Sequence, residues 1–289
     1  MPDSPLLIDV ARQVVPHAFV FDASRYLIAA FLVAGVVWLL NRTSWRTRWI
    51  QPRRAKAKDY LREILTSMQT VLVYSFVGVF TVWGFRNGWM PKYQGEAGAF
   101  EFGGLLIAIV VAHDAYFYWS HRAMHHPKLF KLFHRTHHRT VTPTPFAAYA
   151  FAIPEAFIMA VFIPLWLWLV PTPNGVTFAF LAIMILRNCM GHAGLELHPR
   201  GWVDHPILQW ISTTTHHDMH HSGGFNRNYG FYFTFWDRVM GTEHPDYAQK
   251  FREVTATPAK ADTPRFPGQV VMGGFAGLLA VSVAALMLI

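Results

Sequence analysis

Residues 102–138 of the chain read FGGLLIAIVVAHDAYFYWSHRAMHHPKLFKLFHRTHH. The first half of this stretch, residues 102–119, is apolar on all sides of a helix rather than along one stripe, which is typical of a helix buried in lipid. A run of about this length is near the roughly 20 residues that cross the hydrocarbon core of a bilayer. The second half, residues 120–138, carries six histidines. The stretch therefore predicts a membrane helix that leads into a cluster of imidazoles.

Other parts of the chain repeat the apolar pattern. Of the 289 residues, 53% are hydrophobic and only 15% are charged, against about 25% charged in an ordinary soluble domain. Tryptophan and tyrosine gather at the ends of the apolar runs, as they do at membrane interfaces. We expect an all-α integral membrane protein with about six transmembrane helices and a cytoplasmic, histidine-rich cap that holds two metal ions. The five further runs are residues 26–40, 64–84, 146–170, 174–190 and 268–289.

Two prolines interrupt the fourth of these six segments. Pro154 and Pro164 lie inside the run 146–170, and proline removes a backbone donor and bends or breaks a helix. We expect this segment to be kinked or re-entrant rather than a straight span.

The arginines and lysines predict the orientation. Most of the formal net charge of +8 lies in the loop after the first run, which holds eight basic residues against Asp59 and Glu63. Cytoplasmic loops carry such an excess, so residues 120–145 and 191–267, which contain the histidine clusters, also fall on the cytoplasmic side. The charge is thus a topology signal, and no nucleic-acid partner is expected. The basic residues are Arg42, Arg46, Arg48, Arg53, Arg54, Lys56, Lys58 and Arg62.

The domain organisation follows from these runs. Residues 1–101 are expected to form an amino-terminal region with two transmembrane helices and the basic loop, residues 102–250 the catalytic domain, and residues 251–289 a linker and a last transmembrane helix. No cleavable signal peptide is expected, because the first 25 residues contain three aspartates and no basic segment before a cleavage site. We expect a multi-pass protein of a bacterial inner membrane rather than of the endoplasmic reticulum.

Histidine is abundant and cysteine is rare. The chain has 16 histidines, of which 14 lie between His113 and His221, and one cysteine, which excludes a disulfide framework, a thiolate zinc module and a cysteine-ligated iron–sulfur cluster. Three clusters have helical spacings of three or four, which place two imidazoles on one face. The clusters are His121, His125 and His126; His134, His137 and His138; and His216, His217, His220 and His221.

The number and type of these ligands predict two metal ions. A catalytic zinc needs about three protein ligands, whereas these clusters offer eight or more nitrogens, with His192 in addition. Imidazole suits zinc, copper, iron and nickel, and spacing alone does not choose among them. The neighbouring apolar and aromatic segments would hold an alkyl chain, whose oxidation requires activated oxygen, and this favours iron.

At these residues the sequence resembles the fatty acid hydroxylase and sterol desaturase superfamily of membrane di-iron oxygenases. The similarity covers roughly residues 113–244, with three histidine boxes and the lone His192 between the second and third boxes. One departure concerns the fourth apolar segment, where many members have a His-Pro pair and this chain reads Phe151-Ala-Ile-Pro-Glu155. A ligand or supporting histidine is thus absent there. Further similar stretches are Pro143-Thr-Pro-Phe146, Asn228-Tyr-Gly230, Phe235-Trp-Asp237 and Gly241-Thr242.

The resemblance implies a four-helix transmembrane scaffold under a cytosolic domain with two iron ions, and dioxygen as co-substrate. It identifies as metal ligands His121, His125, His134, His137, His138, His192, His217, His220 and His221. His126 and His216 are alternatives to their neighbours or support them.

Other polar residues near the clusters have open roles. His113 lies nearer the membrane and is either a polar residue at a helix end or a functional one. Glu196 can orient His192 or reach a metal, although an exposed loop carboxylate is the simpler interpretation. Asp218 and Asp237 are candidates for fixing imidazole tautomers. The three histidines interpreted as ordinary surface residues are His17, His205 and His244.

We therefore predict a membrane oxidoreductase, a lipid hydroxylase or desaturase, that acts on a sterol, a fatty acyl group or a related alkyl chain. The chain shows no Gly-rich dinucleotide loop and no haem-attachment motif, so a separate reductase, ferredoxin or cytochrome must supply electrons. A zinc-dependent lipid hydrolase and a histidine-rich membrane metal transporter are the alternatives. Basic residues that can dock an acidic carrier or an anionic lipid headgroup are Arg122, Lys128, Lys131, Arg135 and Arg139.

Overall fold

The structure, a computed structural model, describes residues 6–223 and 225–256. The regular secondary structure of this part of the chain is helical, with loops between the helices and two isolated bridges between extended residues. Among the described residues four helices are long and apolar enough to cross a membrane. They are α1 (Leu7–Leu40), α2 (Ala57–Arg86), α3 (Ala99–Met124) and α7 (Asn174–Gly191).

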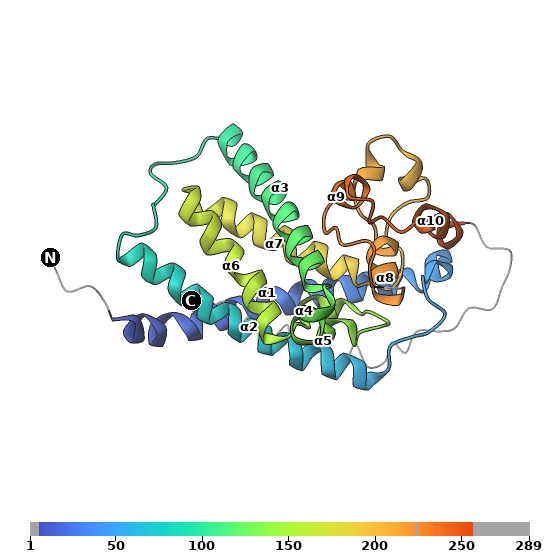
Figure 1. Ribbon diagram of the computed structural model, residues 1–289, viewed down its shortest axis with the longest axis horizontal. Helices are drawn as coiled ribbons and strands as arrows, with labels where there is room; N and C mark the ends of the chain where they lie inside the picture. The colour runs from blue at the N-terminus through green and yellow to red at the C-terminus, as the bar shows by residue number, and fades with distance from the viewer. Residues whose placement is uncertain (1–5, 224, 257–289) are drawn as a thin grey trace.

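Small side chains allow α1 and α2 to lie close together along much of their length (Figure 1). The buried residues of α1 recur at helical spacing and include Ala29, Ala30, Val33 and Ala34. Short side chains on a shared face let two helices approach closely, which in lipid is the main source of packing energy. This pair forms the base on which α6 and α7 rest.

The outer surface of these helices is apolar. Phe76 and Phe80 on α2, Ile107 on α3 and Trp168 on α6 (Ile153–Leu169) are all more than half exposed. A contiguous surface of such side chains is unfavourable in water and is matched by the acyl chains of a bilayer. The helices and their surface therefore agree with a multi-pass membrane protein.

The fourth apolar segment does not form one span of the predicted length. Residues Pro145–Tyr149 are a buried 3-10 turn, and α6 begins only at Ile153 and has 17 residues. The turn is fixed by hydrogen bonds from Tyr26 Oη and Ser67 Oγ to the carbonyl of Phe146, at 2.7 and 3.0 Å. Prolines at the start of the turn and at the start of α6 favour the break, because the first turn is the helical position that proline prefers, while Pro164 lies inside α6.

The six-span count stays a prediction, because the last predicted span, residues 268–289, lies outside the described residues. The five other predicted runs correspond to α1, α2, α3, α6 and α7, and the first of them extends much further toward the amino terminus than the predicted run 26–40.

Short helices form a cap at one end of the long ones. In Figure 1, α8 (Thr214–Ser222), α9 (Phe235–Val239) and α10 (Tyr247–Thr255) gather together, while α4 (Pro127–Phe133) and α5 (Arg135–His138) follow the end of α3. The basic loop between α1 and α2 joins this cap through the bridge between Trp49 and Leu195 and through a hydrogen bond from Gln51 Nε2 to Asp218 Oδ1 at 2.9 Å. The loop and the histidines thus lie at the same end of the helices, and the side of the membrane on which they lie stays a prediction.

Candidate metal centre

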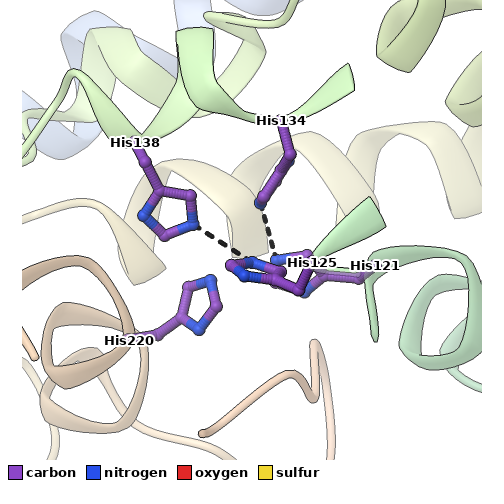
Figure 2. Close-up of side chains that lie close together, drawn as sticks. All are labelled: His121, His125, His134, His138 and His220. Carbon is purple, nitrogen blue, oxygen red and sulfur yellow. Dashed lines mark hydrogen bonds between the residues drawn. The ribbon is translucent and has the colours of Figure 1, made fainter. Parts of the chain in front are cut away.

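Five buried histidines converge where α3, α5 and α8 meet. Each offers a ring nitrogen, and these nitrogens all lie within 4.8 Å of one another. Figure 2 shows the rings pointing toward one another, from the end of α3, from both ends of α5 and from α8. This first histidine group consists of His121, His125, His134, His138 and His220.

Four further buried histidines form a second histidine group beside the first. Their ring nitrogens also lie within 4.8 Å of one another. His192 directly follows α7, and His217 and His221 lie one turn apart on α8, whose amino terminus is capped by the Thr213 side chain. The group consists of His137, His192, His217 and His221. All nine histidines predicted as ligands therefore lie in one of the two groups.

The tautomers of these histidines leave nitrogen lone pairs that face one another. His121 Nδ1 donates to the Tyr229 carbonyl at 2.9 Å, and His192 Nδ1 donates to the Asn188 carbonyl at 2.8 Å. Because a neutral imidazole has one N–H, each Nε2 then carries a lone pair. Yet His121 Nε2 lies 2.9 Å from His134 Nε2, and His192 Nε2 lies 3.0 Å from His217 Nε2.

Such contacts fit a shared cation better than hydrogen bonds. Nitrogens held about 2.1 Å from one ion, at right-angle or tetrahedral positions, lie roughly 3.0–3.4 Å apart. Five Nε2 to Nε2 pairs in the two groups lie between 2.9 and 3.3 Å apart. In addition, His220 Nε2 is buried without a hydrogen-bond partner, although His220 Nδ1 donates to the Arg227 carbonyl at 2.7 Å. The donor set fits a nitrogen-preferring transition metal such as iron in each group.

The four histidines of the second group are held in the neutral form that metal binding requires. Burial lowers the pKa of His192 to about 4, and the hydrogen bond to Asn188 opposes this shift. Burial, followed by repulsion from neighbouring histidines, holds the pKa of His137, His217 and His221 well below the usual range.

One loop orients two members of the first group. The carbonyls of Arg227 and Tyr229 accept the Nδ1 protons of His220 and His121. The loop is held by Asp237, whose carboxylate accepts from the backbone N–H groups of Tyr229 and Gly230 at 2.9 and 2.7 Å. Only glycine fits at position 230, because a Cβ there would lie 2.4 Å from the Phe233 carbonyl oxygen. The Asn228–Gly230 and Phe235–Asp237 stretches are thus parts of one support.

A carboxylate that sequence reasoning missed supports His134. Glu155 Oε1 lies 2.6 Å from His134 Nδ1, and both side chains are buried. A carboxylate that accepts the Nδ1 proton fixes the ring and makes Nε2 a better ligand. Glu155 lies in the stretch where the resemblance indicates an absent histidine, so that departure was the signal that could have found it.

Glu196 is not the exposed carboxylate that we expected. It is fully buried, and it does not contact His192 in any hydrogen bond of the structure. Instead it accepts from His198 Nδ1 at 2.8 Å and from both the backbone N–H and the hydroxyl of Thr215, at 2.7 and 2.6 Å. Burial would raise its pKa, but the hydrogen bonds from His198 and Thr215 hold the pKa below the usual value. Glu196 therefore anchors the amino terminus of α8.

The remaining predicted residues have supporting or peripheral places. His216 is buried outside both groups, with Nε2 3.4 Å from Asp237 Oδ2. Asp218 binds Gln51 and Ser222 rather than an imidazole, so its predicted role in fixing a tautomer is wrong. His126 is exposed and its Nδ1 accepts from the Lys128 N–H at the start of α4. The three histidines interpreted as surface residues, His17, His205 and His244, lie outside both groups and are exposed or half-buried.

An apolar cavity of about 390 Å³ lies among α1, α2, α3, α6 and α7. Residues in its wall also contact the histidines. The ring centroids of Phe117 and His121 lie 5.1 Å apart, and those of Phe151 and His137 lie 5.2 Å apart. The cavity therefore ends against the layer of residues that touches both histidine groups.

Comparison with known proteins finds one family to which part of the chain is similar. The fatty acid hydroxylase family model matches residues 106–242, which include all nine histidines of the two groups. Residues 106–242 are therefore similar to the fatty acid hydroxylase family. The resemblance seen in the sequence is thus confirmed, and the matched residues lie inside the predicted catalytic domain, whose own boundaries stay a prediction.

Two similar curated proteins are named as sterol enzymes. Human lathosterol oxidase is 34% identical over 146 residues, which are 50% of this chain and 46% of that protein. The Delta(7)-sterol 5(6)-desaturase of Leptosphaeria maculans is 33% identical over 129 residues, 45% of this chain and 34% of the relative. The chain thus spans between a third and a half of the length of these relatives. No solved structure matches the chain significantly.

Proposed function

We propose that this protein is a membrane-bound oxidoreductase that uses two iron ions, dioxygen and external electrons to hydroxylate or desaturate a membrane lipid. The observation that carries the proposal is the pair of histidine groups, with five and four imidazoles, at the end of apolar helices and beside an apolar cavity. Relatives named as sterol oxidases and desaturases support a sterol or a related alkyl lipid as substrate.

The histidines, their hydrogen-bond acceptors and two aromatic residues would have separate roles. The nine histidines would hold the two iron ions, and iron with dioxygen would supply the oxidising power that breaking an alkyl C–H bond requires. The carbonyls of Tyr229, Arg227 and Asn188 and the carboxylate of Glu155 orient four of these imidazoles. The aromatic layer of Phe117 and Phe151 keeps water from the side of the histidines that faces the cavity.

A separate electron donor is part of the proposal. Lys128, Lys131, Arg135 and Arg139 are exposed on α4, α5 and the loop after α5, next to the first histidine group. An open hollow lined by Arg122 and His126 reaches His125 between Trp119 and Tyr229. We propose that an acidic reductase, ferredoxin or cytochrome docks on this basic face on the cytoplasmic side, so electron transfer should slow as salt concentration rises.

The decisive test measures metal and oxygen on protein purified in detergent. We expect two iron ions per chain and oxygen uptake that depends on lipid and reductant. Two zinc ions that resist replacement by iron, without oxygen uptake, would contradict the oxygenase and favour the hydrolase. Movement of iron across the membrane of sealed vesicles that contain the protein would favour the metal transporter.

Variants on one helix can separate the two groups. His220 and His221 are adjacent on α8 but belong to different groups. The His220→Ala and His221→Ala variants should each bind about one iron ion fewer per chain and should not oxidise lipid. The His17→Ala variant, whose substitution lies at an exposed position of α1, should keep its iron content and its lipid oxidation activity. Comparing lipid extracts for one added oxygen or two lost hydrogens then identifies the reaction.

A further inference from the structure

The cavity among the long helices has the dimensions of a lipid site. Along α7 its wall extends from Asn174 to Asn188, which at 1.5 Å per residue is about 21 Å. Its volume of about 390 Å³ lies in the range of ligand pockets in proteins. An elongated molecule therefore fits it better than a compact one.

The charges in the wall indicate an uncharged occupant. Of the described residues that line the cavity, Asp22 and Arg25 are the charged pair, and they bind each other at 2.6 Å. The pair is thus neutral as a unit, and Arg25 also donates to the Leu181 carbonyl at 2.9 Å. A charged headgroup in this apolar cavity would lose its hydration without gaining a counter-ion.

His113 supplies an unused polar group in the same wall. It lies on α3 and is only 6% exposed, and its Nδ1 is buried without a hydrogen-bond partner. Aromatic rings surround it, with Phe162 at 4.8 Å and Phe180 at 5.2 Å between ring centroids. Burying such a nitrogen is unfavourable unless a partner arrives, and a hydroxyl can pair with it whichever nitrogen carries the proton.

The place of His113 along the helix orients the occupant. It precedes His121 by eight residues on α3, a rise of about 12 Å. A molecule whose polar group is held at His113 would thus present a hydrocarbon part to Phe117, Phe151 and the histidine groups beyond them.

We propose that this cavity binds an elongated, uncharged lipid with a hydroxyl group, such as a sterol, and that His113 recognises the hydroxyl by a hydrogen bond. His113 is then a specificity-determining residue that lies away from the metal centre. The identification of the occupant as the substrate rests on the proposed function, whereas its binding does not.

The first experiment measures binding without turnover. Protein in lipid nanodiscs, kept free of oxygen, is labelled with a photoactivatable diazirine sterol that carries a free hydroxyl, in competition with lathosterol or with its 3-deoxy analogue. We expect lathosterol to compete about tenfold better than the deoxy analogue, the value of one ordinary hydrogen bond. His113→Phe, which keeps a ring but no nitrogen, should lose this preference, and His113→Gln should restore part of it. A preference unchanged in His113→Phe would overturn the role of His113.

The second experiment locates the site with a matched pair of glycines. Gly78 on α2 lines the cavity, whereas Gly104 on α3 is exposed outside it, and a Cβ at either position meets no atom within 4 Å. Leucine is a better helix former than glycine, so neither substitution should disturb its helix. Gly78→Leu should reduce labelling about tenfold or more, and Gly104→Leu should leave it unchanged. Equal labelling of both variants, or adducts only at the hollow near Trp119, would overturn the cavity assignment.

Two further outcomes separate this inference from the proposed function. Stearate that competes as well as lathosterol would contradict an uncharged occupant. The predicted labelling pattern without any oxygen-dependent product would support the cavity assignment and contradict the oxygenase. If the Gly78→Leu variant formed oxidised product at the wild-type rate, this would support the oxygenase and contradict the cavity assignment.

Discussion

Neighbouring histidines have opposite surroundings in this protein. His125 is buried in the first histidine group, while His126 is exposed and caps α4. His217 belongs to the second group, while His216 faces Asp237. His125 directly follows α3, whereas His126 precedes α4, so the chain turns between them and only His125 points into the group. On α8, consecutive residues point about 100° apart, and this directs His217 into the second group and His216 toward Asp237.

This difference predicts unequal effects of the same substitution. His125→Ala should weaken iron binding at the first group by at least roughly tenfold, because it removes a nitrogen from the group. His126→Ala should leave iron content unchanged. Iron content of the two purified variants measures the effect, and equal losses would mean that the assignment of His125 and His126 is wrong.

Glu155 is the residue whose substitution tests the support of a ligand. Glu155→Gln keeps an oxygen near His134 Nδ1 but removes the charge, so iron should be held roughly tenfold less tightly at the first group. Competition with a chelator measures this affinity. Glu253→Gln, on the exposed face of α10, is the matched control. Identical affinities in the two variants would show that Glu155 does not tune His134.

At the scale of elements, α8 carries three of the nine histidines, and its position depends on one carboxylate. Glu196 binds the amino terminus of α8 through Thr215 and holds His198 in the preceding loop. The helix has only nine residues, too few for independent stability. The histidines of α8 are therefore placed by this anchor and by the contacts with α7 and α10.

Removing the anchor should destabilise the cap. Glu196→Ala leaves the Thr215 N–H and the His198 ring without their buried acceptor, which should lower the free energy of unfolding by about 1–3 kcal/mol. It should also reduce iron content at both groups. Thermal unfolding in detergent checks the first effect, and Glu253→Ala should stay within about 0.5 kcal/mol of the wild type. A stable Glu196→Ala protein with full iron content would contradict the anchor.

The buried imidazoles make the stability of the folded protein depend on metal and on pH. The metal-free cap buries nine histidines whose protonation would place like charges side by side. In the unfolded chain these side chains titrate near pH 6.5. Protons therefore favour the unfolded chain wherever the pKa in the folded protein is lower.

The stability of the metal-free protein should therefore decrease as the pH falls. Burial lowers the pKa of His192 from 6.5 to about 4, so its contribution is complete above about pH 6.5 and is lost as the pH falls toward 4. A shift of this size corresponds to about 3 kcal/mol for His192 alone. Chelated protein should thus unfold at progressively lower temperature between pH 7 and pH 4. An unfolding temperature independent of pH would contradict buried, neutral histidines.

Bound metal should shift this behaviour. Protons and metal compete for the same nitrogens, so the iron-loaded protein should keep its stability to lower pH and then lose iron and stability together. Unfolding curves of loaded and chelated protein, recorded over the same pH series, check this outcome.

Much of this protein is readable from local sequence. An apolar run long enough to cross a bilayer has few alternatives, which is why residues 64–84, 102–119 and 174–190 predict α2, α3 and α7 closely. Ligand chemistry is equally local, because imidazoles at spacings of three and four indicate a metal without knowledge of the fold. The nine predicted ligands required only these two patterns and the resemblance to a family.

The partition of those histidines into two groups was decided by the tertiary structure. His137 and His138 are adjacent on α5 but belong to different groups, because the histidines that each one meets come from other parts of the chain. The same holds for Glu155, Glu196 and His113, whose roles come from contacts that no spacing encodes. Hydrophobicity and helical periodicity are properties of a segment, whereas burial, hydrogen-bond partners and cavities arise only when segments pack together.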